Sequence, residues 1–172
     1  WLLDAMAVVA SETFTATSAP IQYAAVRAFK GGADMEHYLL HSRRILRGLA
    51  SWIWQKLTAA GINVARPDGA FYMLPDFETQ RPQLEARGIY SGEQLCQRLL
   101  DETGVAMLPG NCFGRPDREL TVRLAFVDFD GARSLAAAEQ IPAELELDDA
   151  FLRQHCEKVL TAIERVCDWL QE

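Results

Sequence analysis

The spacing of apolar residues along the chain predicts mainly helices. Apolar positions recur at intervals of three or four residues through several stretches, most of which end at a glycine or a polar run. Such a period is typical of a helix that buries one face. We therefore expect helices over 2–10, 21–29, 34–60, 91–103, 134–140 and 152–170.

Shorter apolar runs predict strands. In the run 120–126 the large aliphatic and aromatic residues fall on one face, and Arg123 falls on the other between small residues. Runs over 62–66 and 70–74 are expected to be two strands joined across a Pro-Asp-Gly turn. The stretch 76–88 is polar and has no apolar period, so a surface loop is expected there.

Length and charge narrow the classes of function. The chain has 172 residues, enough for one sizeable core or for a domain with an appended piece. Its formal charge of −7 gives no electrostatic footprint for nucleic acid or an anionic membrane surface. No apolar run approaches the roughly 20 residues that span a bilayer. Small-molecule or protein partners and a cytoplasmic location are therefore expected.

The cysteines and histidines do not predict a metal site. The four cysteines fit neither a zinc pattern nor a dense disulfide scaffold, so we expect free thiols in a reducing cytoplasm. His37 and His41 have a helical spacing, but no acidic residue follows the first as zinc-protease chemistry requires. The chain opens on Trp1 inside an apolar segment, which suggests a piece of a longer protein.

Arg123 is the residue with the clearest candidate chemistry. An arginine between small residues on a strand either reaches solvent or presents its planar fork to a carboxylate in a shallow pocket. The spacing alone leaves both interpretations open.

Three motifs in register add to this picture. The chain carries Pro-x-Gly-x-Phe, then Gly-Val-x-x-x-Pro-Gly-x-x-Phe-Gly, then an arginine in a short apolar strand. Their residues are Pro67, Gly69 and Phe71; Gly104, Val105, Pro109, Gly110, Phe113 and Gly114; and Arg123. This order resembles the C-terminal part of class I/II aminotransferases, which are pyridoxal 5′-phosphate enzymes of fold type I.

The resemblance implies an α/β fold with a short sheet flanked by helices, the small C-terminal domain of such an enzyme. Residues 1–33 would be the tail of the large cofactor domain, and 34–172 the small domain. It also implies a homodimer that moves an amino group between an amino acid and a 2-oxo acid.

The resemblance assigns roles to individual residues. Arg123 matches the family's arginine that grips the substrate α-carboxylate. The residues expected to line the substrate mouth are Gly69, Phe71, Asn111 and Phe113. Thr15 takes the place of a loop hydroxyl that reaches the neighbouring subunit's cofactor phosphate, although a loop threonine that caps a turn explains it equally well.

The cofactor-bearing lysine has no counterpart. Lys30, Lys56 and Lys158 are the only lysines, and none lies near the motifs. No catalytic residue is therefore assigned, and the chain alone is expected to be inactive. Two rival interpretations stay open: another reaction at Cα (a lyase, a decarboxylase or a synthase), and a non-catalytic ligand-sensing module of a regulator. The substrate amino acid is also open.

Overall fold

The computed structural model describes residues 1–14 and 16–171, which divide into two compact units, Trp1–Leu39 and Leu40–Glu172. The N-terminal unit carries α1 (Leu2–Thr13) and α2 (Ala19–Phe29), the predicted pair of helices. Neither helix contains a buried residue. Their large apolar side chains are exposed, among them Trp1, Leu3, Met6, Val9, Phe14, Ile21, Tyr23 and Phe29.

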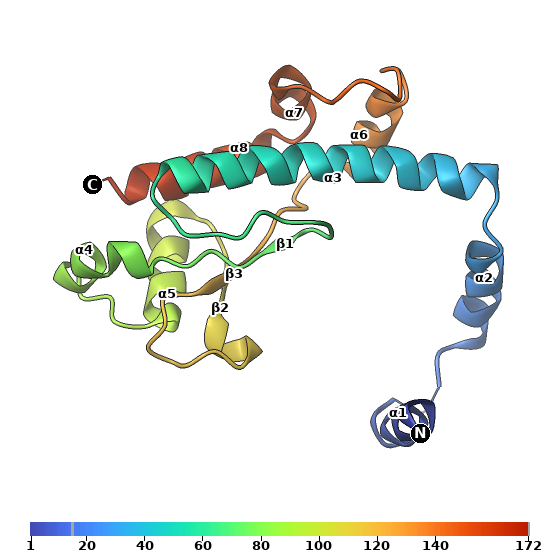
Figure 1. Cartoon of the computed structure of the whole chain (residues 1–172), viewed down its shortest axis with the longest axis horizontal. Helices are drawn as coiled ribbons and strands as arrows, with labels where there is room; N and C mark the ends of the chain where they lie inside the picture. Colours follow the sequence, from blue (N-terminus) through green and yellow to red (C-terminus); the bar gives the residue numbers. More distant parts are fainter. Residues whose placement is uncertain (15, 172) are drawn as a thin grey trace. The chain divides into compact units, whose positions relative to one another are not determined.

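The long helix α3 (Ala33–Ala59) supports the C-terminal unit (Figure 1). It matches the predicted helix closely, because its apolar positions keep one face toward the core over most of its length. The residues of α3 that are buried in the core are Ile45, Leu49, Ala50, Trp52, Ile53 and Leu57.

A small antiparallel sheet lies in the same unit. It consists of β1 (Tyr72–Met73), β2 (Leu108–Pro109) and β3 (Val122–Ala125), in the order β1-β3-β2. The central strand β3 therefore has a partner on both edges. In this register Tyr72 faces Ala125 across one pair, and Leu108 faces Arg123 across the other.

The remaining elements are helical. They are η1 (Glu78–Gln80), α4 (Arg81–Ala86), α5 (Gly92–Thr103), η2 (Gly110–Phe113), α6 (Gly131–Ala138), α7 (Asp149–His155) and α8 (Glu157–Trp169). Together with the sheet they enclose one core, whose fully buried members include Phe77, Leu84, Leu95, Leu99, Leu120 and Phe126. The short sheet flanked by helices confirms the expected fold class.

The start of α5 forms as its sequence predicts. Ser91 accepts a hydrogen bond from the backbone N–H of Gln94 at 3.3 Å, and the Gln94 side chain accepts one from the backbone N–H of Tyr90 at 2.7 Å. The helix ends at Gly104, whose φ of 74° is the left-handed conformation that glycine adopts without strain. These caps fix both ends of the helix that contacts β2.

Three predicted elements differ in the structure. The range 62–66 forms no strand, only a single bridge between Asn63 and Asp76, because β1 pairs with β3 instead. The expected loop 76–88 contains the helices η1 and α4. These helices have few apolar residues, but Arg81 pairs with Glu78 and Glu85 at helical spacing.

The closing helix is also different, because it breaks at Cys156 into α7 and α8. Asp148 caps α7 by accepting a hydrogen bond from the backbone N–H of Phe151 at 2.9 Å. The break lets Leu152 of α7 approach Gly48 of α3. A continuous helix would not present both α7 and α8 to the core, so the apolar period alone could not show the break.

Arg44 fastens the segment between α6 and α7 to α3. Its guanidinium is buried and donates hydrogen bonds to the backbone carbonyls of Ala138, Ile141, Pro142 and Leu145 at 2.8–3.1 Å. Carbonyl dipoles thus replace the water that a buried cation loses. The side chain holds a loop that has little regular structure of its own.

Candidate functional site

The site is built on the central strand of the sheet. Along β3 and its flanks, Leu120, Val122, Leu124 and Phe126 are buried, whereas Arg123 is half-buried and Ala125 exposed. Thr121, which shares the face of Arg123, is buried at the start of the run, but the alternation from 122 to 126 confirms the prediction that the arginine points away from the core face. Because β3 is paired on both sides, the backbone of Arg123 is held firmly in place.

Two aromatic rings enclose the Arg123 guanidinium. Its central carbon lies 4.6 Å from the centroid of the Tyr72 ring and 4.4 Å from that of Phe113. Stacking of a planar cation on aromatic faces orients the fork and stabilises it by about 0.5–1 kcal/mol per ring. The rings come from β1 and from η2, so the site needs all three segments.

One donor of the fork lacks a partner. The Arg123 Nε is buried and donates no hydrogen bond, and no acidic side chain in residues 1–14 or 16–171 forms an ion pair with this guanidinium. A buried donor without a partner costs about 1–3 kcal/mol. A ligand carboxylate that approaches along the Nε edge would remove this cost and bind in a bidentate manner.

The turn that carries Phe113 is held by Asn111. Its amide nitrogen donates to Glu93 Oε1 at 3.0 Å and to Asp117 Oδ1 at 3.1 Å, which ties η2 to the start of α5. The amide oxygen is buried without a hydrogen-bond partner. Gly110 begins this turn so close to β3 that a Cβ would lie 2.9 Å from the carbonyl oxygen of Thr121.

The structure brings together only some of the residues that were expected to line the substrate mouth. Phe113 stacks on Arg123, Asn111 lies in the same turn, and the Phe71 ring lies 4.4 Å from the Tyr72 ring. Gly69 instead lines a pocket against α3 that does not include Arg123. Thr15 lies outside the described residues.

Sequence reasoning missed Tyr72. The signal was available in principle, since Tyr72 faces Ala125, and Ala125 shares a strand face with Arg123. This cross-strand relation depends on the pairing of β1 with β3. The apolar pattern paired 70–74 with 62–66 instead, so the nearness of Tyr72 to Arg123 could not be seen.

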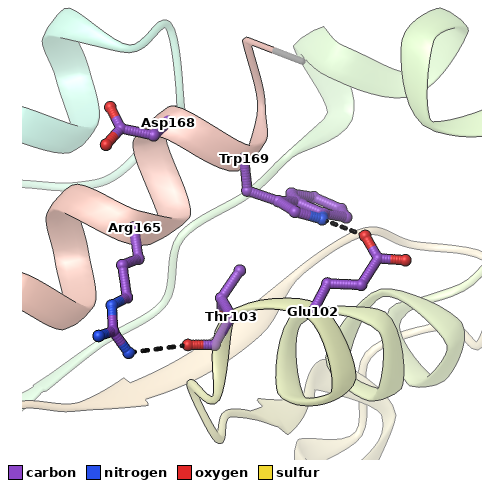
Figure 2. A pocket seen from close by; sticks show the side chains of 5 residues that line it. All are labelled: Glu102, Thr103, Arg165, Asp168 and Trp169. Atoms are coloured by element: carbon purple, nitrogen blue, oxygen red, sulfur yellow. Dashed lines mark hydrogen bonds between the residues drawn. The ribbon is translucent and has the colours of Figure 1, made fainter.

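A further polar pocket of about 290 Å³ lies between α5 and α8 (Figure 2). The Trp169 indole N–H donates to the Glu102 carboxylate at 2.5 Å, and Arg165 donates to the carbonyl of Thr103 at 3.4 Å. Asp168 points away from these pairs (Figure 2). The pocket's polar groups therefore serve the packing of the two helices.

Titratable clusters elsewhere do not suggest a metal centre. Within the described ranges, 1–14 and 16–171, no group of three or more His, Cys, Asp or Glu side chains could hold an ion. In those same ranges, no helix is both long and apolar enough to cross a membrane.

Comparison with known proteins identifies the class to which this fold belongs. Residues 1–138 match the family model of aminotransferase class I and II, so the chain belongs to this family. Members of the family depend on pyridoxal 5′-phosphate.

Individual relatives agree with this assignment. Aspartate aminotransferase of Bacillus sp. (strain YM-2) is 32% identical over 73% of this chain. Asparagine–oxo-acid transaminase of Streptococcus mutans is 30% identical, also over 73%. In both cases the match spans 30% of the relative's length.

Solved structures show the same fold. A Thermus thermophilus aspartate aminotransferase mutant matches 97% of this chain with a TM-score of 0.62 at 25% identity, and the match covers 36% of that protein. The aromatic aminotransferase of Pyrococcus horikoshii matches with a TM-score of 0.59 at 23% identity.

Proposed function

We propose that this chain provides the substrate-carboxylate site of a pyridoxal phosphate-dependent aminotransferase. In this proposal Arg123 binds the α-carboxylate of an amino acid or 2-oxo acid. One observation carries the proposal: a guanidinium fixed between two rings keeps its Nε buried and without a partner. A fixed carboxylate sets the direction of the substrate Cα–H bond, which determines the bond that breaks.

The cofactor would supply the electron sink for this reaction. The lysines of this chain do not fit the covalent attachment of that cofactor. Lys56 lies over the Trp52 ring at 5.2 Å, Lys158 lies 3.6 Å from an Asp128 oxygen, and Lys30 lies in the N-terminal unit. None of these three lysines is therefore placed to carry the cofactor, and we expect the chain alone to be inactive.

The role of the N-terminal unit is part of the same proposal. Residues 1–33 would belong to the large domain and 34–172 to the small one. The exposed apolar side chains of α1 and α2 support this, since such a surface is normally covered by further protein. We propose a homodimer in the cytoplasm as the form in which this surface is covered.

The names of the relatives favour amino-group transfer over the two rival interpretations. The curated relatives named above are a transaminase and an aspartate aminotransferase. Arg123 would serve a lyase or a decarboxylase equally well, so the reaction type rests on these relatives. Amino acids and 2-oxo acids are the substrates we propose.

Binding of a carboxylate to the full chain tests the site directly. We expect L-aspartate or 2-oxoglutarate to shift the Arg123 Nε–Hε NMR resonance with saturation. The Arg123→Lys variant should lose the saturable binding, because a point charge cannot replace the bidentate fork. Arg133→Lys, which changes an exposed arginine of α6, is the matched control. An unchanged Arg123 resonance at high ligand concentration would refute the proposal.

A further inference from the structure

A second group of arginines lies apart from the carboxylate site. Arg43, Arg47 and Arg66 line one pocket of about 560 Å³ between α3 and the loop before β1. All three side chains are exposed, and no carboxylate in residues 1–14 or 16–171 pairs with them. The pocket thus concentrates positive charge on a chain whose formal charge is −7.

Helical spacing aligns the donors on one wall. Arg43, Arg47 and Ser51 follow at intervals of four residues, so their side chains project from the same face of α3. The Ser51 hydroxyl lies in the same pocket and can donate a hydrogen bond. This face of α3 therefore presents two guanidinium groups and one hydroxyl in a row.

The loop before β1 contributes the third cation. Arg66 lies with its guanidinium carbon 5.6 Å from the centroid of the Trp54 ring. The Trp54 indole N–H in turn donates to the carbonyl of Val64 at 3.2 Å. The Trp54 ring, which belongs to α3, thus holds the segment that carries Arg66 against this helix.

The turn from Pro67 to Ala70 closes the pocket. Ala70 has a φ of 59°, a left-handed conformation that bends the chain sharply. A Cβ at Gly69 would contact nothing within 4 Å, so the space above the turn is open to a ligand. Asp68 is the single acidic residue that lines the pocket, and three arginines outweigh it.

The adjoining pocket does not compete for the same ligand. It shares Arg47, Ser51 and Arg66 but adds Arg44 and the carboxylates of Glu144, Glu146 and Asp149. An anion is therefore attracted to the side of the groove that carries Arg43, away from these three carboxylates.

We infer that this pocket binds a small polyanion, a molecule that bears two or more phosphate or carboxylate groups. Guanidinium forks match both groups geometrically, and three forks around one cavity fit several anionic groups better than one. The inference uses none of the residues of the carboxylate site and does not depend on the proposed function.

Calorimetric titration of the full chain tests this inference, with pyrophosphate and citrate as the probes. We expect saturable binding of at least one of them, and the tighter of the two assigns phosphate or carboxylate as the anion class. Arg47→Gln and Arg66→Gln should each weaken binding about tenfold or more, as expected for a lost charged hydrogen bond. Arg133→Gln removes an exposed arginine outside the pocket and should leave the affinity unchanged.

Other results would overturn the inference. These are the absence of saturable binding of both probes, an equal loss of affinity in Arg133→Gln, or binding of a hexaglutamate peptide without binding of either small anion. The last result would indicate an acidic protein segment as the ligand instead. Arg123→Lys is expected to retain the affinity for pyrophosphate, which separates this test from that of the carboxylate site.

Discussion

The guanidinium carbon of Arg123 lies 4.4 Å from the centroid of the Phe113 ring, although η2 and β3 are separate segments. The centroid of the Tyr72 ring lies 4.6 Å from the same carbon. The fork therefore has a defined orientation before any ligand arrives. Pre-organisation of this kind lowers the entropic cost of binding a carboxylate.

Loss of one ring should weaken this orientation. We expect Phe113→Leu to reduce carboxylate affinity several-fold, because removal of one stacking contact of about 0.5–1 kcal/mol frees the guanidinium. NMR titration with 2-oxoglutarate measures the affinity. Tyr90→Leu, which removes an exposed ring away from the contacts of Arg123, is the control. Equal affinities in the two variants would contradict the role of stacking.

Replacement of the Arg123 guanidinium should have a larger effect than loss of one ring. In the protein that carries this chain in the cell, we expect Arg123→Lys to lower kcat/KM for amino-group transfer by about 10- to 150-fold, which corresponds to 1.5–3 kcal/mol. A coupled assay of 2-oxo acid formation measures this change. Full activity in the variant would show that another group binds the carboxylate.

The hydrogen bonds from Arg44 to the carbonyls of residues 138–145 predict a loss of stability when this side chain is replaced. Arg44→Leu should lower the free energy of unfolding by about 3–5 kcal/mol, because the carbonyls of residues 138–145 lose their buried donor. The adjacent exposed Arg43→Leu should change it by less than about 0.5 kcal/mol. Urea unfolding followed by tryptophan fluorescence measures the free energy of unfolding of both variants. Similar losses in the two would refute the stabilising role of Arg44.

Two glycines offer a matched comparison. Gly110→Ala should destabilise the fold by about 1–3 kcal/mol, since its Cβ would overlap the Thr121 carbonyl at 2.9 Å. Gly131→Ala, at the start of α6, meets no atom within 4 Å and should be neutral or slightly stabilising. Thermal unfolding of both variants checks this, and an unchanged midpoint for Gly110→Ala would contradict the close approach.

Buried thiols predict a loss of stability in alkali. Burial raises the pKa of Cys96 to about 12 and that of Cys156 to about 11, from an ordinary value of 9.0. Above pH 9 the unfolded chain releases these protons while the folded chain keeps them, so the free energy of unfolding falls as pH rises through this window.

Urea unfolding at pH 8 and pH 10.5 measures this decline. A double variant, Cys96→Ala and Cys156→Ala, should show a smaller decline than the original chain. Cys112→Ala, which removes an exposed thiol, should not. An equal decline in all three proteins would show that other groups determine the alkaline stability.

Local signals predicted most of the helices well. The long apolar period of α3 and the caps of α5 are encoded within a few neighbouring residues, and both formed as expected. The pairing of β1 with β3 and the break at Cys156 depend on contacts between distant segments, so the local pattern could not show them. The same reason hid Tyr72, whereas Arg123 could be singled out locally because it is the charged residue between small residues on the outward face of an alternating strand.

The two-sided pairing of β3 has a consequence for how this protein tolerates change in length. Side chains alternate between the two faces of a strand, so a slip of one residue in β3 would turn Arg123 inward and Val122 or Leu124 outward. A single inserted or deleted residue between η2 and β3 would have to be absorbed in the turn at 114–119. If the strand moved instead, the chain would lose the proposed carboxylate site and the packing of its core together.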